Sequence, residues 1–252
     1  MPEKIDEVDI LNFALNLEYL EAEFYTYATT GKSITSFGLG IKGHATGGNS
    51  TTGGTTSGGG KVSFSKEESE LHDLATQIGA DERAHVVLLR GALGSAAVAM
   101  PNIDLGALGF GFGNQNDFLR AARILEDIGV TAYSGAAGLL KTADIITAAA
   151  CLLGAEAEHA ATIRTQIARL KIPTTALDGV DLVPPPSGEP RQVLSIKVSD
   201  GLIATRTAGQ VLYLAFGGKT DAKQGGFFPT GLNGTITSSM ESAATSKVAA
   251  AK

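Results

Sequence analysis

The residues best suited to chemistry are two Glu-x-x-His motifs, Glu82/His85 in "DERAH" and Glu156/His159 in "GAEAEHA". A separation of three residues places the carboxylate and the imidazole one turn apart on the same face of a helix. Both groups are common ligands of divalent metal ions. One such motif by itself is a weak signal, so a metal site requires further carboxylates at the same level.

Helical patterns at four places supply the framework for these motifs, at about residues 6–29, from Ser65 to about 92, at about 116–140, and from Thr142 to about 170. Apolar residues recur three or four positions apart in each pattern, which is typical of a helix with one buried face. Ser65 followed by Glu68 predicts a capping box at the start of the second helix. Each buried row contains a carboxylate near its middle, and these are Glu18, Glu82, Glu126 and Glu156.

Four carboxylates buried at one level need a shared partner, because an unpaired buried carboxylate is costly, and two metal ions would supply one. The predicted ligands are Glu18, Glu82, His85, Glu126, Glu156 and His159. A Glu from each of two helices, with Glu-x-x-His from the other two, is the pattern of carboxylate-bridged dimetal proteins. The alternative is a bundle without metal, whose carboxylates share protons or pair with Arg83 and Arg123.

An internal repeat supports the metal interpretation. Tyr25 lies seven residues after Glu18. Tyr133 lies seven residues after Glu126, so the second pair of helices looks like a copy of the first. The first pair is longer by an insertion, residues 31–64, whose Gly, Thr and Ser content predicts a flexible loop that buries no apolar surface.

The order of the helices predicts an all-α fold, a four-helix bundle with a long crossover between helices two and three. Helices three and four are joined by few residues and should be antiparallel neighbours, whereas residues 92–116 can run the length of the bundle. We assign residues 1–170 to the bundle and 171–252 to a C-terminal extension that wraps it. Within the extension, Thr207 and Gln210 predict the capping box of a short fifth helix.

Other carboxylates near the motifs have different expected roles. Glu21 is three residues from Glu18 and is a candidate auxiliary ligand, whereas Glu23 should be solvated. Glu158 lies about 200° around the helix from Glu156, so it should face away from the metal site.

The remaining histidines and the cysteine are predicted to have no chemical role. His44 should be solvated within the Gly-rich loop, and His72 should be exposed beside the inward row of the second helix. Cys151 stands within an apolar stretch that should be buried, where it would act as a small hydrophobic residue.

The ligand set resembles that of the ferritin-like superfamily, which includes bacterioferritin, rubrerythrin and manganese catalase, over about residues 5–170. The resemblance implies that Glu82 and Glu156 bridge two metal ions and that Tyr25 and Tyr133 support the ligands. The stretches "ILNFALNLEYLEAEFY", "RTAGQVLYLAFG" and "GGFFPTGLNG" look like the family of plant desiccation-related proteins and their bacterial relatives. That narrower resemblance implies an association with stress.

One departure from the ferritin-like pattern concerns the residue before each motif. Such sites often place Asp there, which orients a ligating histidine. Asp81 fits this pattern before Glu82, but Ala155 precedes Glu156. One histidine is therefore expected to rely on a backbone carbonyl, water or another side chain.

Two hypotheses of function follow. In the first, the protein is a diiron oxidase that oxidises Fe(II) with oxygen or peroxide, and with manganese in place of iron the site would dismutate peroxide. Tyr25 or Tyr133 would then supply hydrogen bonds or an electron. In the second, the bundle is structural and protects against stress or desiccation, with metal bracing the core or absent. Because the insertion and the extension fit poorly into an iron-storage cage, we expect a monomer or homodimer.

Composition argues against several other classes of protein. The formal net charge is -6 and no run of Lys or Arg occurs, which argues against a nucleic-acid partner. No stretch reaches the roughly 18 to 20 apolar residues of a membrane span. The N-terminus shows no secretory signal, which predicts a cytoplasmic protein, with export after removal of a signal as the alternative.

Overall fold

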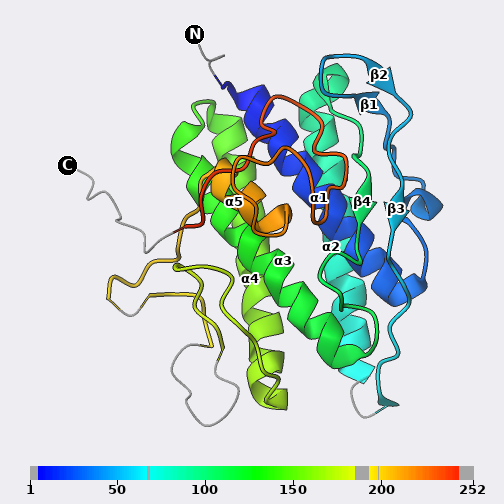
Figure 1. Ribbon diagram of the computed structural model, residues 1–252, viewed down its shortest axis with the longest axis vertical. Coiled ribbons are helices and arrows are strands. Elements are labelled where there is room, and N and C mark those ends of the chain that lie inside the picture. The colour runs from blue at the N-terminus through cyan, green and yellow to red at the C-terminus, as the bar shows by residue number, and fades with distance from the viewer. Residues whose placement is uncertain (1–4, 67–68, 185–192, 198, 244–252) are drawn as a thin grey trace.

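The structure, a computed structural model, describes residues 5–66, 69–184, 193–197 and 199–243 of the 252-residue chain. Its long helices are α1 (Glu7–Thr30), α2 (Ser69–Leu93), α3 (Gln115–Ala136) and α4 (Ala143–Leu170). They pack as two pairs, α1 against α2 and α3 against α4, and α1 also contacts α3 (Figure 1). The prediction of an all-α four-helix bundle is confirmed.

Local sequence explains where the helices begin. Asp6 and Asp9 form a capping box at the start of α1. At the start of α3, the side chain of Asn114 accepts hydrogen bonds from two backbone amides. These bonds satisfy amide groups that the first turn of a helix leaves without a partner. Glu68 lies outside the described residues, so the capping box expected with Ser65 stays a prediction.

The connection between α2 and α3 returns along the bundle, from the end of one helix to the start of the other (Figure 1). It begins with a 3-10 turn (Gly94–Ala96) and contains the short strand β4 (Ile103–Asp104). By contrast, only a 3-10 turn (Ala137–Leu139) and residues 140–142 join α3 to α4. The long crossover and the antiparallel packing of α3 and α4 agree with the predicted arrangement.

The Gly-rich insertion contains a 3-10 turn (Ile34–Phe37) and the strands β1 (Gly43–His44), β2 (Ser50–Thr51) and β3 (Thr56–Ser57). β1 pairs antiparallel with β2, and β3 pairs parallel with β4 of the crossover. Ile34 and Val62 are buried, so the expectation of a loop without apolar burial is wrong. These side chains are buried because the ends of the insertion pack on the bundle, where Val62 N donates to Ala28 O (2.8 Å). The flexibility of the insertion stays a prediction.

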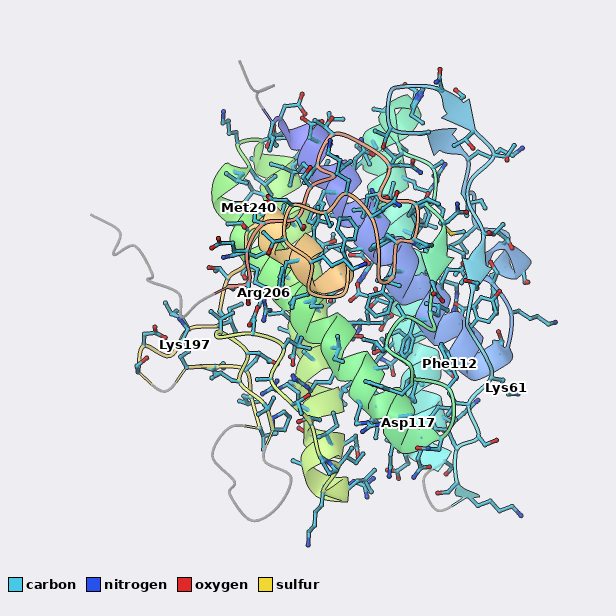
Figure 2. The ribbon with its side chains drawn as sticks, viewed as in Figure 1. Lys61, Phe112, Asp117, Lys197, Arg206 and Met240 are labelled. Carbon is cyan, nitrogen blue, oxygen red and sulfur yellow. The ribbon has the colours of Figure 1, made fainter. Side chains whose placement is uncertain are left out.

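The C-terminal extension contacts α3 through its short helix, α5 (Ala208–Ala215), which crosses α3 in Figure 1. The capping box of Thr207 and Gln210 begins this helix as predicted. Arg206 N donates to Thr131 O on α3 (3.0 Å), and Met240 packs on the first turn of α5. Figure 2 shows Arg206 and Met240 beside this helix. The division of the chain into a bundle and an extension at residue 170 stays a prediction.

Buried arginine–aspartate pairs lie within the bundle, within the extension and between the two. The pairs are Arg123 with Asp127 and Asp181, Arg164 with Asp127, and Arg206 with Asp178. All of these side chains are almost completely buried. Because a buried charge without a partner is costly, the pair of Arg123 with Asp181 holds the segment after α4 against α3. Hydrogen bonds from Arg164 on α4 to Leu182 O, and from Arg206 to Thr131 Oγ1 on α3 (2.7 Å), add to this contact.

The first half of α4 is less buried than its apolar sequence predicts. Ile146 and Cys151 are exposed, so the prediction that Cys151 lies in a buried stretch is wrong. The reason is that α4 packs chiefly against α3, which leaves its other sides open. In the described part of the chain, no helix has the length and apolar character needed to cross a membrane.

Candidate metal centre

The six predicted ligands meet inside the bundle, as two overlapping groups. One group, with ligand atoms all within 4.8 Å of one another, consists of Glu18, Glu82, His85 and Glu156. The other, defined by the same limit of 4.8 Å, consists of Glu82, Glu126, Glu156 and His159. Glu82 and Glu156 belong to both groups, as expected of bridging carboxylates. The buried cluster is compatible with a metal ion, and the role of each ligand stays a prediction.

The chemistry of the buried donor atoms fits a cation. All four predicted carboxylate ligands have 0% exposure. The donor atoms that lack a hydrogen-bond partner among the described residues are Glu82 Oε1, Glu126 Oε2, both carboxylate oxygens of Glu156, and His159 Nδ1. Leaving such atoms buried and unpaired is costly. A metal ion would satisfy them together, because carboxylate oxygen and imidazole nitrogen are both good ligands.

His159 illustrates this arrangement. Its Nδ1 lies 2.9 Å from Glu82 Oε1 and 3.4 Å from Glu126 Oε2, yet neither contact has the geometry of a hydrogen bond. On the other side of the ring, Nε2 lies 3.4 Å from Asp81 Oδ2. Donation from Nε2 to Asp81 leaves the Nδ1 lone pair directed at the cluster, as a metal ligand requires.

Two tyrosines hold carboxylates across the bundle. Tyr25 on α1 donates its hydroxyl to Glu126 Oε1 on α3. Tyr133 on α3 donates to Glu18 Oε1 on α1 in the same way. Burial, followed by the negative charge of the accepting carboxylate, raises the pKa of both tyrosines well above the usual value, so both remain neutral donors. The repeat seen in the sequence therefore corresponds to two reciprocal contacts, in each of which the tyrosine of one helix binds the glutamate of the other.

Glu21 also faces the cluster. It is buried, and a Cβ at Gly129 on α3 would lie 3.2 Å from Glu21 Oε1 and would overlap Glu156 Oε2. Gly129 follows Glu126 by three residues, as Glu21 follows Glu18. The glycine therefore provides the space that a fifth carboxylate occupies. The candidate role of Glu21 as an auxiliary ligand stays a prediction.

Other polar residues lie apart from the centre. Glu23 was expected to be solvated, but it is fully buried, because the chain turns back after α1 and Ser33 Oγ donates to Glu23 Oε1 (2.7 Å). His44 is only half-buried, and its ring nitrogens contact the backbone oxygens of Gly48 (3.2 Å) and Ser95 (2.9 Å). His44 is therefore only partly solvated, and the expectation of a fully solvated side chain is wrong.

Glu158 is exposed, as predicted for a solvated charge, and it belongs to neither ligand group. His72 is partly exposed, with 44% of its side chain accessible, and its ring packs edge-on against Phe64.

The arginines proposed as alternative partners do not neutralise the ligands. Arg83 donates to Thr26 Oγ1 (3.0 Å) and lies over the ring of Phe37. Arg123 is held by Asp127 and Asp181. The alternative in which the carboxylates pair with these two arginines is therefore wrong. The other part of that alternative, proton sharing among the carboxylates, stays a prediction.

Burial and mutual repulsion change the pKa values within the centre. Burial raises the pKa of Glu82 to about 7, although contacts with the histidines lower it. Burial and neighbouring carboxylates raise the pKa of Glu156 and of Glu21 well above the usual value. Burial disfavours a charged imidazole, yet contacts with carboxylates raise the pKa of His85 to about 10 and of His159 to about 11. Metal binding at neutral pH must therefore displace protons.

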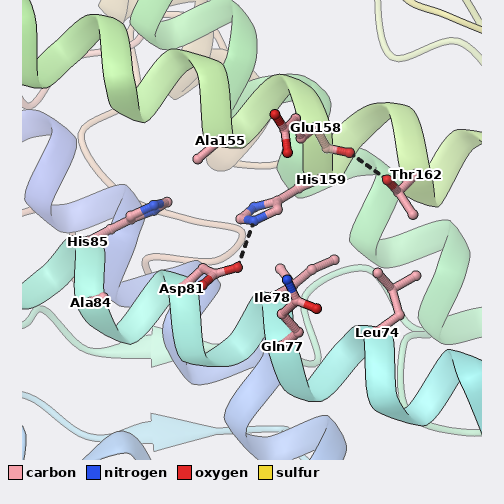
Figure 3. Close-up of a pocket in the computed structure, with 10 residues that line it drawn as sticks. All are labelled: Leu74, Gln77, Ile78, Asp81, Ala84, His85, Ala155, Glu158, His159 and Thr162. Atoms are coloured by element: carbon pink, nitrogen blue, oxygen red, sulfur yellow. Dashed lines mark hydrogen bonds and ion pairs between the residues drawn. The ribbon is translucent and has the colours of Figure 1, made fainter.

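The centre opens to the surface between α2 and α4. A pocket of about 360 Å³ lies there, and His85 and His159 are among the residues that line it (Figure 3). Asp81 and Ala155 line the same pocket on opposite helices. Water-soluble ligands can therefore reach both imidazoles from this side.

A second, apolar cavity of about 30 Å³ lies on the opposite side of the centre, between α1, α3 and α4. Its lining is hydrophobic and includes Leu17, Ala132, Ala136 and the ring of Tyr133. Because Tyr133 also holds Glu18, this cavity reaches the residues that surround the ligands. A cavity of this size has room for a small apolar molecule and would not hold water strongly.

Comparison with known families agrees with this geometry. The sequence profile of the ferritin-like domain matches residues 6–169, which include all four long helices except the last residue of α4. The chain belongs to the ferritin-like domain family. No curated protein matches the chain in sequence. Ferritin-like membership confirms the superfamily inferred from the ligand pattern, while the narrower desiccation-related family stays a prediction.

Proposed function

We propose that this ferritin-like protein binds two metal ions, iron in the cell, and oxidises Fe(II) with oxygen or peroxide. The observation that carries the proposal is the sharing of Glu82 and Glu156 by two adjacent ligand groups. Two Fe(II) ions held there would supply two electrons and become Fe(III). With two protons, these electrons would reduce oxygen to hydrogen peroxide, or hydrogen peroxide to two waters.

The surrounding residues have defined parts in this scheme. Tyr25 and Tyr133 orient Glu126 and Glu18 by donating hydrogen bonds to them. Glu21 lies outside both ligand groups, and its raised pKa allows it to hold a proton beside the shared carboxylates. Closed packing around the carboxylates keeps bulk water away and strengthens their attraction for cations.

Oxygen is favoured as an oxidant by the apolar cavity at Tyr133. Dioxygen is small and apolar, whereas peroxide is polar and would enter through the pocket between α2 and α4. The two openings give the two oxidants different routes to the same centre.

Aerobic addition of Fe(II) to metal-free protein tests the proposal, with ferric absorption and oxygen consumption as readouts. We expect two Fe(II) per chain to be oxidised faster than in buffer. The double variant Glu82→Ala/His85→Ala should abolish this reaction, and Glu158→Gln, which changes an exposed charge on α4, should retain it. A wild type that neither oxidises iron nor retains metal after purification without added metal would overturn the proposal.

Manganese is the alternative metal, in which case the centre would convert two peroxide molecules into two waters and oxygen. The donor set of carboxylates and imidazoles is suited to both metals. Elemental analysis of protein purified without added metal decides between them.

A structural role is the second candidate function. The buried ion pair of Arg123 and Asp181 links the segment after α4 to the bundle, and a metal ion at the centre would link all four helices in the same way. The resemblance of both ends of the chain to desiccation-related proteins favours a stress-protective role for such a bundle. Under this reading, the Glu82→Ala/His85→Ala variant melts at a lower temperature, and the wild type shows no turnover.

We also expect a cytoplasmic monomer or homodimer. Light scattering would contradict that expectation if it showed a large cage.

A further inference from the structure

Besides the Glu21/Gly129 difference, the two halves of the centre differ at the residue that precedes each Glu-x-x-His motif. Glu82 on α2 corresponds to Glu156 on α4, so Asp81 corresponds to Ala155. Both residues line the pocket between the two helices, and Figure 3 shows each of them close to a histidine. A carboxylate therefore faces the pocket from α2, and only a methyl group faces it from the matching place on α4.

The carboxylate serves the histidine of the opposite helix. Asp81 Oδ2 lies 3.4 Å from Nε2 of His159, not near the histidine of its own motif. If the residue before each motif contacts the histidine of the opposite helix, the partner of His85 would be residue 155, where the chain has alanine. Among the described residues, no hydrogen-bond partner is found for Nε2 of His85, whose Nδ1 contacts Glu18 and Glu82 at 3.2 Å.

The two predicted metal positions have the same kinds of direct ligands. Each group contains three glutamates and one histidine, and both groups share Glu82 and Glu156. Any difference in metal affinity must therefore come from groups behind the ligands. A carboxylate behind a ligating imidazole fixes the ring and strengthens its lone pair, and loss of such a partner weakens metal binding by about 10- to 100-fold.

We propose that the two metal positions are unequal, and that the position held by His85 is the weaker one and exchanges its metal through the pocket between α2 and α4. This inference rests on the dimetal centre of the proposed function. The position held by His159 keeps its metal, because Asp81 fixes that ring. Ala155 presents only a methyl group to the pocket, so His85 meets an incoming or departing cation there without a carboxylate behind its ring.

Titration of metal-free protein with Co(II), followed by calorimetry and by visible absorption, tests this inference without any turnover. The wild type should bind two ions per chain in two steps, with dissociation constants about 10- to 100-fold apart. Ala155→Asp should strengthen the weaker step by about ten-fold or more and leave the stronger step unchanged. Asp81→Ala should weaken the stronger step and bring the two constants together.

Matched variants separate orientation from simple charge. Glu158→Gln removes a negative charge from the same pocket, at a side chain that makes no hydrogen bond or ion pair with either imidazole among the described residues, and it should leave both steps unchanged. Ala155→Asn adds similar bulk without charge and should strengthen the weaker step less than Asp does.

Two equal binding steps in the wild type, or an Asp81→Ala variant with unchanged constants, would overturn the inference and leave the dimetal proposal standing. A wild type that binds no Co(II) would overturn both. If Ala155→Asp fails to fold, the wild type and Asp81→Ala decide the outcome.

Discussion

At the scale of single residues, the crowding of carboxylates around Gly129 determines how the centre can be assembled. Glu21 and Glu156 come from different helices, and both use the space beside the α-carbon of Gly129. A side chain at that position would push at least one carboxylate out of place. Glycine usually weakens a helix, so its presence in the middle of α3 is explained by this packing.

The substitution Gly129→Ala should therefore reduce metal affinity by about ten-fold or more, because the new Cβ overlaps a carboxylate oxygen of Glu156. Titration with Co(II) measures the loss, and circular dichroism should show that helix content is retained. Gly154→Ala is the matched control, since it adds the same methyl group to α4 with no atom within 4 Å. Unchanged affinity in Gly129→Ala would show that the carboxylates can rearrange freely.

At the scale of the helices, α1, α3 and α4 define which molecules reach the centre from the apolar side. Ala132 and Ala136 keep the cavity beside Tyr133 open because their side chains are small. Ala136→Phe should fill this cavity and slow the oxidation of Fe(II) by oxygen several-fold, with little effect on oxidation by peroxide. Stopped-flow measurements with each oxidant test this difference.

Ala137→Phe serves as the control for that experiment, because it adds the same ring at an exposed neighbouring position. Equal slowing with both oxidants in Ala136→Phe would instead indicate a disturbed centre.

The stability of the C-terminal extension depends on an ion pair between two of its own residues. Arg206 and Asp178 are at most 1% exposed and lie 2.8 Å apart. Asp178→Asn would leave the arginine buried without a charged partner, so it should lower the free energy of unfolding by about 3–5 kcal/mol. Urea unfolding measures this loss.

For comparison, Asp73→Asn changes a side chain that is 85% exposed and should alter stability by less than about 0.5 kcal/mol. A similarly small effect in Asp178→Asn would mean that the ion pair contributes little to holding the extension.

At the scale of the whole molecule, the buried cluster makes stability depend on pH. In metal-free protein the folded pKa values of Glu82, Glu156, His85 and His159 are all raised above their unfolded values. The folded state therefore binds more protons than the unfolded state, from about pH 4.5 for the glutamates and about pH 6.5 for the histidines upward. Their contribution to stability is present at low pH and is lost as the pH rises through the folded pKa values.

The free energy of unfolding of metal-free protein should thus fall between about pH 5.5 and about pH 8.5, as measured by thermal unfolding. Bound Co(II) should raise the melting temperature more at the higher pH, because metal binding displaces the protons that the cluster otherwise holds. Stability of the metal-free protein that rose with pH over this range would contradict the assigned protonation of the cluster.

Much of this protein follows from local sequence alone. The apolar spacing of the helices, and the positions of Glu82, His85, Glu156 and His159 on their inward faces, depend on the helical repeat of 3.6 residues, which is a local property. The capping box at Thr207 and Gln210 is local in the same sense. For this reason the all-α bundle, its crossover and the six residues of the cluster could be predicted before any helix was placed beside another.

Tertiary packing decided what the helical repeat does not specify. The burial of Glu23, the exposure of Cys151 and the pairing of Arg123 with Asp181 depend on which segments cover each helix. The contact between Asp81 and His159 is of the same kind, because it joins residues of two different helices. Spacing along one helix determines which side chains share a face, but only the packing of helices in space determines what that face meets.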